Sequence, residues 1–291
     1  SVFSMAVTPK SKADLEKMSL VLPRICEEDL TLQVLRDPDT SEFLLQGFGE
    51  VHLEVAVEKL VRKFGVELEL APPKIAYRET VASAVTAEYK HKKQTGGHGQ
   101  YGHVVIELEP LPRGSGFEFA EKVVGGSVPK NYFPAVEKGV NEGKQEGVLA
   151  GYPLTDLRVT LVGGSYHEVD SSEISFKIAA VQALKKGLSD GQPVLLEPIV
   201  TLVVRVPENY TGDIIGDLNT KRGRILGMDR EGNTSIIRAQ VPLAEVNRYA
   251  VDMRSLTQGR GDYTLEFSHY EEVPAHITQK IVEKKAAAAS R

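Results

Sequence analysis

The chain has 291 residues, which is long for one hydrophobic core and predicts two or three domains of roughly 70–150 residues each. Its 41% hydrophobic and 26% charged residues are typical of a globular protein and exclude a fibrous or disordered chain. No apolar run approaches the roughly 20 residues that span a bilayer, and no signal peptide begins the sequence, so we expect a cytoplasmic protein with no membrane partner. The net charge of −5 excludes a broadly basic surface, so any contact with RNA must be local.

The first 74 residues predict a small α+β domain with six elements. In chain order these are a strand at 2–7, a helix that starts near Ser11, strands at 30–34 and 43–45, a helix from 51 that stops at Gly65, and a strand at 66–70. This strand–helix–strand–strand–helix–strand order is the split βαβ or ferredoxin-like arrangement, in which two helices cover one face of four antiparallel strands.

Residues 197–273 predict the same scheme a second time, without detectable sequence identity to the first copy. The expected elements are strands at 199–206, from 224, at 235–240 and at 263–267, and helices at 209–220 and 243–256. Between the copies, residues 75–196 predict three or four long strands and two helices, near 130–145 and 172–188. A final helix is expected from Pro274, within the tail 274–291.

A glycine-rich stretch within residues 90–102 is the most unusual segment. Lys90, Lys92 and Lys93 precede four glycines that fall within seven residues. Glycines leave backbone N–H groups bare, and the flanking strands predict a long hairpin with a basic, flexible tip that suits a phosphate or an RNA groove. The chain contains no GxxxxGK[ST] sequence, so this is not a nucleotide-binding loop. A glycine-rich tip without a function is the alternative.

A second loop, at 163–173, brings His167 to the start of the helix at 172–188. A Ser–His–Asp triad needs an aligned nucleophile and an oxyanion hole, and Asp170 and Ser171 are better explained as helix caps. We therefore expect an exposed recognition histidine and no catalytic residue. We also expect no metal site. The histidines at 91, 98 and 103 do not have the spacing of metal ligands, and the single Cys26 is expected to be a buried side chain that only fills space in the core.

Lys221, Arg222 and Arg224 form a third candidate, at the end of a predicted helix. Cations there interact favourably with the helix dipole and with phosphate groups. A solvated helix end is the alternative, and Arg254 and Arg260 extend the basic region only if they share its face.

Eight sequence blocks, taken in this order, resemble bacterial-type elongation factor G, a translational GTPase. The blocks are 47–54, 77–80, 93–102, 125–129, 149–153, 164–173, 195–198 and 254–261, and the resemblance covers about 2–273. It implies ferredoxin-like domain III at 1–74, a domain IV like ribosomal protein S5 domain 2 at 75–196, ferredoxin-like domain V at 197–273, and a C-terminal helix and tail at 274–291.

The resemblance also implies a function in protein synthesis. Such a chain is the ribosome-binding part of a monomeric factor that promotes GTP-dependent translocation of tRNA and mRNA, and the tip of its domain IV enters the decoding A site. Implied contacts to tRNA, mRNA and the decoding site are Gln94, Thr95, Gly96, Gly97, His98, Gly99, Gln100 and His167. Implied contacts to rRNA are Lys90, Lys92, Lys93, Lys221, Arg222 and Arg224.

GTP and Mg²⁺ are expected in an N-terminal GTPase domain that precedes this chain, which starts within a strand and without Met. The chain alone is therefore expected to hold no cofactor and to have no GTPase activity. Three alternatives stay open: a ribosome-recycling or ribosomal-protection paralogue, a generic RNA-binding module, which is disfavoured because no RNP1-type string is present, and a small-molecule enzyme that uses His167.

Overall fold

A computed structural model describes residues 3–95 and 97–290 of the chain. The chain divides into two compact units, one formed by Ser1–Ala76 and Pro198–Ser268 and the other by Tyr77–Glu197 and His269–Arg291. Each unit therefore joins segments that are far apart in the sequence. Within the described ranges, no helix combines the length and the apolar character that crossing a membrane requires.

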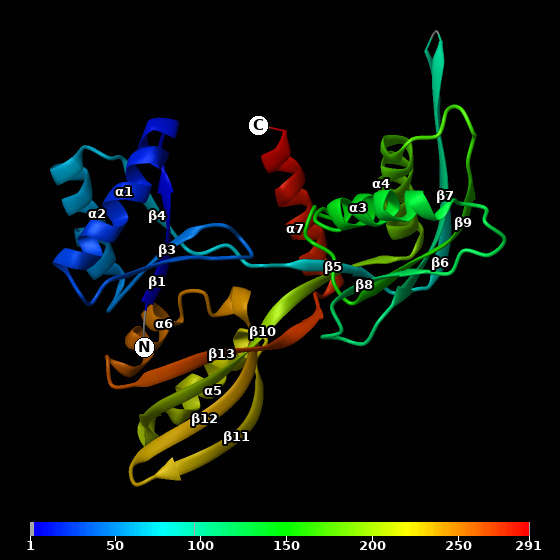
Figure 1. Ribbon diagram of the computed structural model, residues 1–291. Helices are drawn as coiled ribbons and strands as arrows, with labels where there is room; N and C mark the ends of the chain where they lie inside the picture. The colour runs from blue at the N-terminus through cyan, green and yellow to red at the C-terminus, as the bar shows by residue number, and fades with distance from the viewer. Residues whose placement is uncertain (1–2, 96, 291) are drawn as a thin grey trace. The chain divides into compact units, whose positions relative to one another are not determined.

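The N-terminal sheet of the first unit has the predicted ferredoxin-like order (Figure 1). Its elements are β1 (Phe3–Pro9), α1 (Lys12–Glu28), β2 (Gln33–Arg36), β3 (Phe43–Gly47), α2 (Glu50–Phe64) and β4 (Leu68–Ala71). The Ser11 side chain accepts the N–H of Asp14 and caps α1, and Gly65 ends α2 with a left-handed φ of 62°. Leu22, Leu45 and other buried side chains form the core, at whose edge Cys26 is half-buried rather than fully buried.

The second sheet of this unit repeats the arrangement of the first. Its elements are β10 (Pro193–Pro207), α5 (Thr211–Thr220), β11 (Arg224–Glu231), β12 (Thr234–Pro242), α6 (Tyr249–Thr257) and β13 (Asp262–Glu272). The sheet orders are β2-β3-β1-β4 and β11-β12-β10-β13, so in both copies the strands lie in the order second, third, first, fourth. The predicted α+β class is confirmed, and the repeat exists without sequence identity because only the apolar spacing is shared.

The predicted helix at 243–256 is wrong in its first half. A 3₁₀ turn at Leu243–Glu245 is followed by a break, and α6 starts only at Tyr249. The break occurs at Asn247, whose side-chain amide donates to the carbonyl of Pro73 at 2.9 Å. Asparagine is a weak helix former, and here its side chain makes a tertiary hydrogen bond. A second 3₁₀ turn, at Glu208–Tyr210, likewise replaces the start of the predicted helix at 209–220.

A hydrogen-bond network fixes the turn between β3 and α2. The ring of His52 accepts the N–H of Phe48 at Nδ1 (3.1 Å) and donates from Nε2 to Asp29 (3.0 Å). The Asp29 carboxylate also accepts the hydroxyl and the N–H of Thr31. Hydrogen bonds from Thr31 and then from His52 lower the pKa of Asp29 to about 2. A Cβ at Gly47 would lie 2.7 Å from Nδ1 of His52, so this turn requires glycine.

We expect the stabilising effect of Asp29 to depend on pH. Its pKa is about 2 in the folded chain against an ordinary value of 3.8, so the ionised carboxylate stabilises the fold above about pH 4, and this contribution is lost as the pH falls towards 2. Asp29→Asn should therefore be less stable than the parent chain at pH 7, and the difference should shrink steadily below pH 4. Urea unfolding at a series of pH values measures it, and a difference that stays constant down to pH 2.5 would contradict the assignment.

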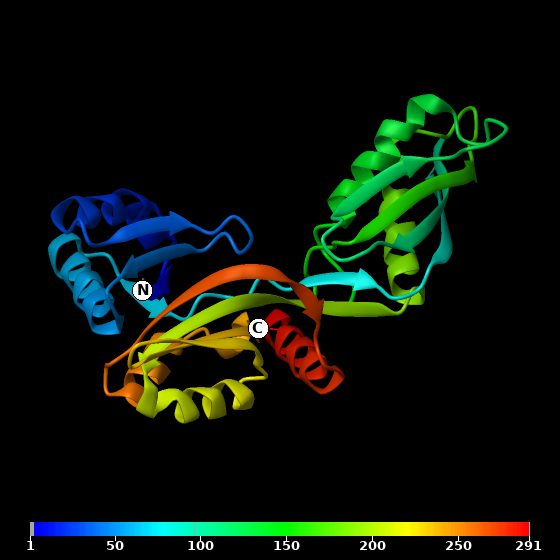
Figure 2. The ribbon, with the colours of Figure 1, turned by 90° about the horizontal axis from the view of Figure 1, so that it is seen from below.

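The second unit is built on a four-stranded sheet with two helices on one side (Figure 2). Its elements are β5 (Arg78–Val81), β6 (Val85–Thr95), β7 (His98–Pro110), β8 (Phe117–Glu121), α3 (Phe133–Gly143), β9 (Leu157–Ser165), α4 (Glu173–Asp190) and α7 (Ala275–Ala289). The sheet order is β6-β7-β9-β8, and α3 connects the parallel pair β8 and β9. The sequence predicted three or four strands here because β5 and β8 are too short to show a clear alternation.

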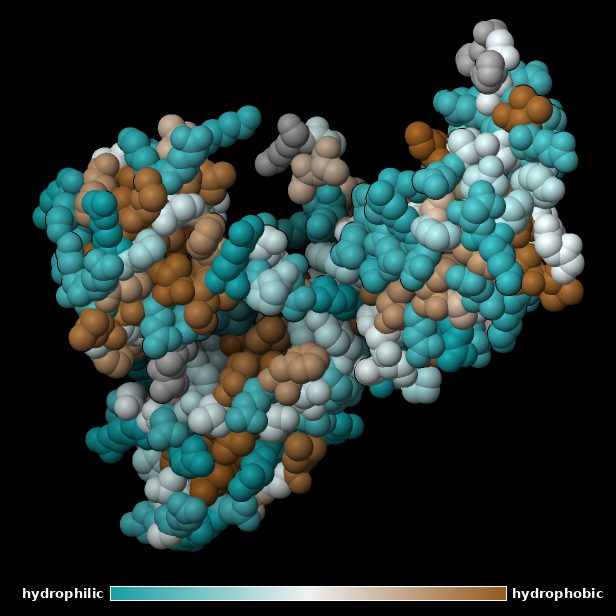
Figure 3. Space-filling model, in the orientation of Figure 1, coloured by the Kyte–Doolittle hydropathy of each residue, from teal (hydrophilic) through white to brown (hydrophobic). Residues whose placement is uncertain are grey.

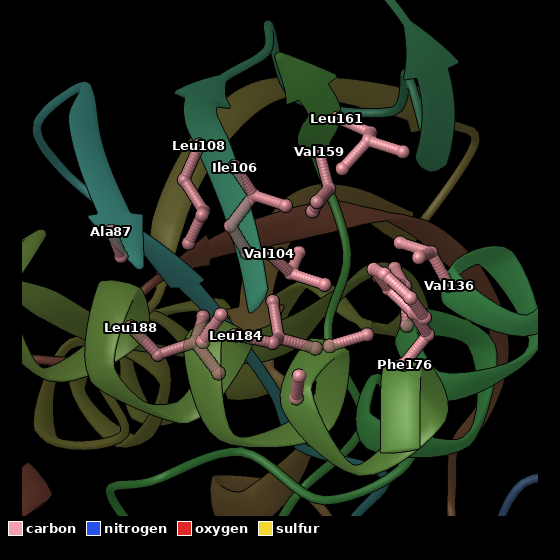
Figure 4. Packing of buried hydrophobic residues seen from close by; sticks show 14 of the residues in the cluster. Ala87, Val104, Ile106, Leu108, Val136, Val159, Leu161, Phe176, Leu184 and Leu188 are labelled. Carbon is pink, nitrogen blue, oxygen red and sulfur yellow. The ribbon is translucent and has the colours of Figure 1, made fainter. Parts of the chain in front are cut away.

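The core of the second unit lies between α4 and the strands β7 and β9. Figure 4 shows Phe176 and Leu184 of α4 pointing towards Val104 and Ile106. Helices α3 and α4 approach closely, since a Cβ at Gly139 would lie 2.5 Å from the carbonyl oxygen of Lys177. This packing leaves one face of β6 and β7 open to solvent and covers the other.

A buried carboxylate connects two of the sequence blocks. Glu79 in β5 is 1% exposed, and it accepts the backbone N–H groups of Leu149, Ala150 and Tyr152 at 2.8–3.0 Å. Three charge-assisted hydrogen bonds satisfy the charge away from water. The blocks 77–80 and 149–153 therefore have a structural role, which is to hold the loop before β9 against β5.

Candidate nucleic-acid interface

The hairpin of β6 and β7 extends beyond the rest of the second unit (Figure 1). Its strands pair without a shift from Val85 opposite Leu108 to Thr95 opposite His98, so the predicted long hairpin is confirmed. The predicted contact Gly96 lies outside the described residues, and the side chains of Thr95 and His98 do as well.

The two faces of the hairpin carry different side chains. Lys90, Lys92 and Gln94 alternate along β6 on the face that α4 does not cover, and all three are exposed. The opposite face carries Lys93, which is exposed, and His91, which is 6% exposed and bonds Gln100 at 2.9 Å. The predicted basic residues are thus divided between two faces, and only the open face combines two lysines with an amide.

A polar chain crosses the open face from β6 to β9. The hydroxyl of Tyr101 lies 2.6 Å from Ser165 Oγ, which lies 2.9 Å from His103 Nδ1, and His103 Nε2 lies 2.9 Å from Glu88. The hydrogen bond from His103 lowers the pKa of Glu88. Both ring nitrogens of His103 are therefore engaged, and the part of the chain that the structure describes contains no group of three or more side chains able to hold a metal ion.

The loop after β9 presents His167 to solvent. Its side chain is 56% exposed, and its ring lies 6.3 Å from that of Tyr101, centroid to centroid. The backbone N–H groups of Val169 and Asp170 face Nδ1 at 3.4 Å, and a carboxylate oxygen of Asp170 lies 3.6 Å from the same nitrogen. His167 is thus exposed, as expected.

Asp170 is not a helix cap, so that prediction is wrong. The cap of α4 is Ser172, whose hydroxyl accepts the N–H of Ser175 at 3.2 Å. Asp170 instead bonds the hairpin: its carboxylate accepts the N–H of Gly99 at 3.0 Å and its carbonyl accepts the N–H of Tyr101 at 2.8 Å. The predicted contacts Gly99 and His167 are thereby brought together. The sequence alone does not reveal this link, because an aspartate that caps a helix and one that bonds a distant strand have the same side-chain chemistry.

The glycines of the hairpin have different roles from the predicted one. A Cβ at Gly99 would lie 2.8 Å from the carboxylate of Asp170, and a Cβ at Gly102 would lie 2.6 Å from the backbone of Ser175. Gly97 alone among the described tip glycines has open space around it, with a φ of 122°. The prediction that the glycines leave their N–H groups available to a ligand is therefore wrong for Gly99, whose N–H is bonded to Asp170. Gly102 is needed for the close packing of β7 on α4.

We expect Gly102→Ala to destabilise the second unit by about 1–3 kcal/mol, because the new methyl group meets backbone atoms that cannot rotate away. The matched control is Gly216→Ala in α5, where nothing lies within 4 Å and the same change should stabilise by up to about 1 kcal/mol. Urea unfolding of both variants measures the contrast. Equal effects of the two substitutions would contradict the packing role.

The basic group at the end of α5 is largely paired within the first unit. Lys221 has a side chain 15% exposed, contacts Asp217, and lies 3.3 Å from Asp252. Burial opposes its charge, but these two carboxylates raise the pKa of Lys221 overall. Arg222 bonds Glu245 at 3.0 Å and Arg224 bonds Gln240. Their role as rRNA contacts stays a prediction, and they lie in a different unit from the hairpin tip.

Lys221→Met should destabilise the first unit by about 2 kcal/mol or more, since it leaves the partly buried Asp217 and Asp252 without their cation. Arg230→Met is the control: Arg230 pairs with Glu208 with both side chains more than half exposed, and such surface pairs contribute about 0–1 kcal/mol. Thermal unfolding of both variants tests this. A Lys221→Met protein as stable as the Arg230→Met control would contradict the stabilising role of Lys221.

The described fold is that of a multidomain α+β protein in which two ferredoxin-like sheets accompany a hairpin-bearing domain. Three models of one family match it in succession: Elongation Factor G, domain III, at residues 1–72; Elongation factor G, domain IV, at 73–192; and Elongation factor G C-terminus, at 194–281. The chain belongs to the elongation factor G family and comprises these three parts of it.

Individual relatives agree with this assignment. The chain is 52% identical over 285 residues to the elongation factor G-like protein of Thermotoga maritima and 51% identical over 290 residues to the elongation factor G of Aquifex pyrophilus. The matches cover 98% and 99% of the chain and 42% of each relative, so the chain spans less than half the length of these curated relatives. A crystal structure of a Thermus thermophilus protein matches with a TM-score of 0.86 and 46% identity, over 98% of this chain and 43% of that one.

Proposed function

We propose that this chain is the ribosome-binding part of a translation elongation factor that promotes GTP-dependent translocation of tRNA and mRNA. In this proposal the hairpin tip and the His167 loop enter the decoding A site and contact the tRNA and mRNA. The observation that carries it is that Asp170 joins these two segments at one exposed end of the second unit, beside Lys92 and Gln94. Membership in the elongation factor G family supplies the ribosome as the partner.

The chemistry of this end suits an RNA duplex. The ammonium groups of Lys90 and Lys92 can neutralise phosphates. Because the two lysines succeed each other along one face of a strand, they can contact neighbouring phosphates of an RNA backbone. The amide of Gln94 and the imidazole of His167 can donate hydrogen bonds to phosphate oxygens and 2′-hydroxyls. Figure 3 shows a mostly hydrophilic surface on the visible side of the second unit. Because the whole chain is acidic, with a net charge of −5, attraction to RNA is confined to such places.

The remaining assignments follow from the same proposal. GTP and Mg²⁺ would bind in a separate GTPase domain of the longer protein, and this chain would hydrolyse no GTP alone. Domains III, IV and V would occupy 1–74, 75–196 and 197–273, close to the matched ranges. Lys93 and the less enclosed arginines Arg222 and Arg224 would contribute contacts to rRNA, and the factor would act as a monomer in the cytoplasm.

Cosedimentation of the chain with 70S ribosomes tests the proposal. The double variant Gln94→Ala, His167→Ala should weaken binding about tenfold, because two hydrogen bonds of ordinary strength are lost. The control is Gln279→Ala, His276→Ala, which removes the same side chains from exposed positions of α7 and should leave binding unchanged. Lys92→Ala should reduce the slope of log K against log salt concentration by about one, because one phosphate contact is lost.

The alternatives give different results in the same assays. Equal ribosome binding by the tip variant and its α7 control would remove the tip from the interface. Tighter binding to free single-stranded RNA than to ribosomes would favour a generic RNA-binding module. A recycling paralogue is distinguished by assays of the full-length factor. Such a factor would split ribosomes into subunits faster than it promotes translocation of tRNA and mRNA.

A further inference from the structure

We infer that Asp170 is a positioning residue that holds the His167 loop against the β6–β7 hairpin, so that His167 and Gln94 meet an RNA partner as one preformed surface. This inference rests on the proposed function and names a residue that acts through its neighbours. Asp170 needs no contact of its own with the RNA.

The contacts of Asp170 join both parts of the tip through one side chain. Oδ1 accepts the N–H of Gly99 at 3.0 Å, and Oδ2 lies 3.6 Å from Nδ1 of His167. The backbone carbonyl of the same residue accepts the N–H of Tyr101 at 2.8 Å. A single residue therefore contacts the hairpin at two positions and the recognition histidine at a third.

The hairpin is shaped to receive this carboxylate. A Cβ at Gly99 would lie 2.8 Å from both Cγ and Oδ2 of Asp170, so any larger residue displaces the loop. Other bonds hold the root of the loop: His167 donates its N–H to Ser171 Oγ at 2.8 Å, and Tyr132 donates its hydroxyl to the carbonyl of Ser171 at 3.3 Å. Loss of the carboxylate therefore frees the distal part of the loop without releasing its root.

The position of this link favours a role in binding over a role in folding. The Asp170 side chain is 26% exposed and is not among the side chains that form the hydrophobic core of this unit. Its hydrogen bond to Gly99 is part-buried, and the net contribution of one hydrogen bond to global stability is modest. Ordering a loop before association instead lowers the entropic cost of binding, and this benefit appears only when the ribosome is present.

Three variants of the chain test the inference: Asp170→Ala, Asp170→Asn and His167→Ala. Asp170→Ala should raise amide hydrogen exchange at Gly99 at least about tenfold while changing Tyr101 less, because Tyr101 bonds the backbone carbonyl that remains. It should weaken ribosome binding about as much as His167→Ala does. Asp170→Asn keeps an acceptor oxygen and should restore both properties to within about twofold.

A double-mutant cycle separates positioning from direct contact. The variant with both Asp170→Ala and His167→Ala should bind ribosomes no more weakly than His167→Ala alone, because Asp170 acts through His167. Gly99→Ala provides a second route: it should weaken binding in the parent chain but have no further effect in the Asp170→Ala background, where the clashing carboxylate is absent.

The outcomes that overturn the inference are distinct from failure of the proposed function. Unchanged exchange at Gly99 in Asp170→Ala overturns the link itself. Strictly additive losses in the cycle, or normal ribosome binding by Asp170→Ala when His167→Ala binds weakly, overturn the positioning role. If His167→Ala binds normally, the proposed function of the tip fails and the positioning role fails with it, whereas increased exchange at Gly99 would still demonstrate the link.

Discussion

The close contact of β7 with the first turn of α4 determines where the candidate interface lies. At Gly102 the strand has no side chain, and the backbone of Ser175 occupies the space that a Cβ would need. This contact places the start of α4 beside the hairpin, and the loop that precedes α4 then runs along β7. The positions of His167 and Asp170 follow, because that loop carries both residues. Without Gly102 the two parts of the tip would have no reason to meet.

Much of the fold follows from local rules that the sequence displays. Alternating apolar residues predicted both ferredoxin-like sheets, and Ser11 and Gly65 marked the ends of helices as their side-chain chemistry requires. The failures have tertiary causes. Helix α6 starts late because Asn247 bonds a carbonyl 174 positions earlier in the chain, and the short strands β5 and β8 are defined by partners distant in sequence. Local patterns carry no information about such partners.

The candidate interface was predictable in composition but not in structure. The sequence identified Lys90, Lys92, Gln94 and His167 as exposed polar groups, which they are. It assigned the glycines to exposed N–H groups, although close packing explains Gly99 and Gly102. It also treated Lys221 as free for phosphate, since Asp252 comes near it only through the packing of α6 beside α5. Charge can be read from a sequence, but the neutralisation of that charge depends on tertiary contacts.

The mutual fit of Gly99 and Asp170 has a consequence for divergence within the family. A carboxylate at 170 leaves no room for a side chain at 99, whose Cβ would lie 2.8 Å away, and a side chain at 99 would in turn require a smaller residue at 170. A side chain is therefore accommodated at position 99 only when the residue at 170 is smaller. A change at 170 to a residue of the same shape, such as asparagine, places no demand on position 99, whereas a side chain gained at 99 requires the loss of the link that Asp170 makes.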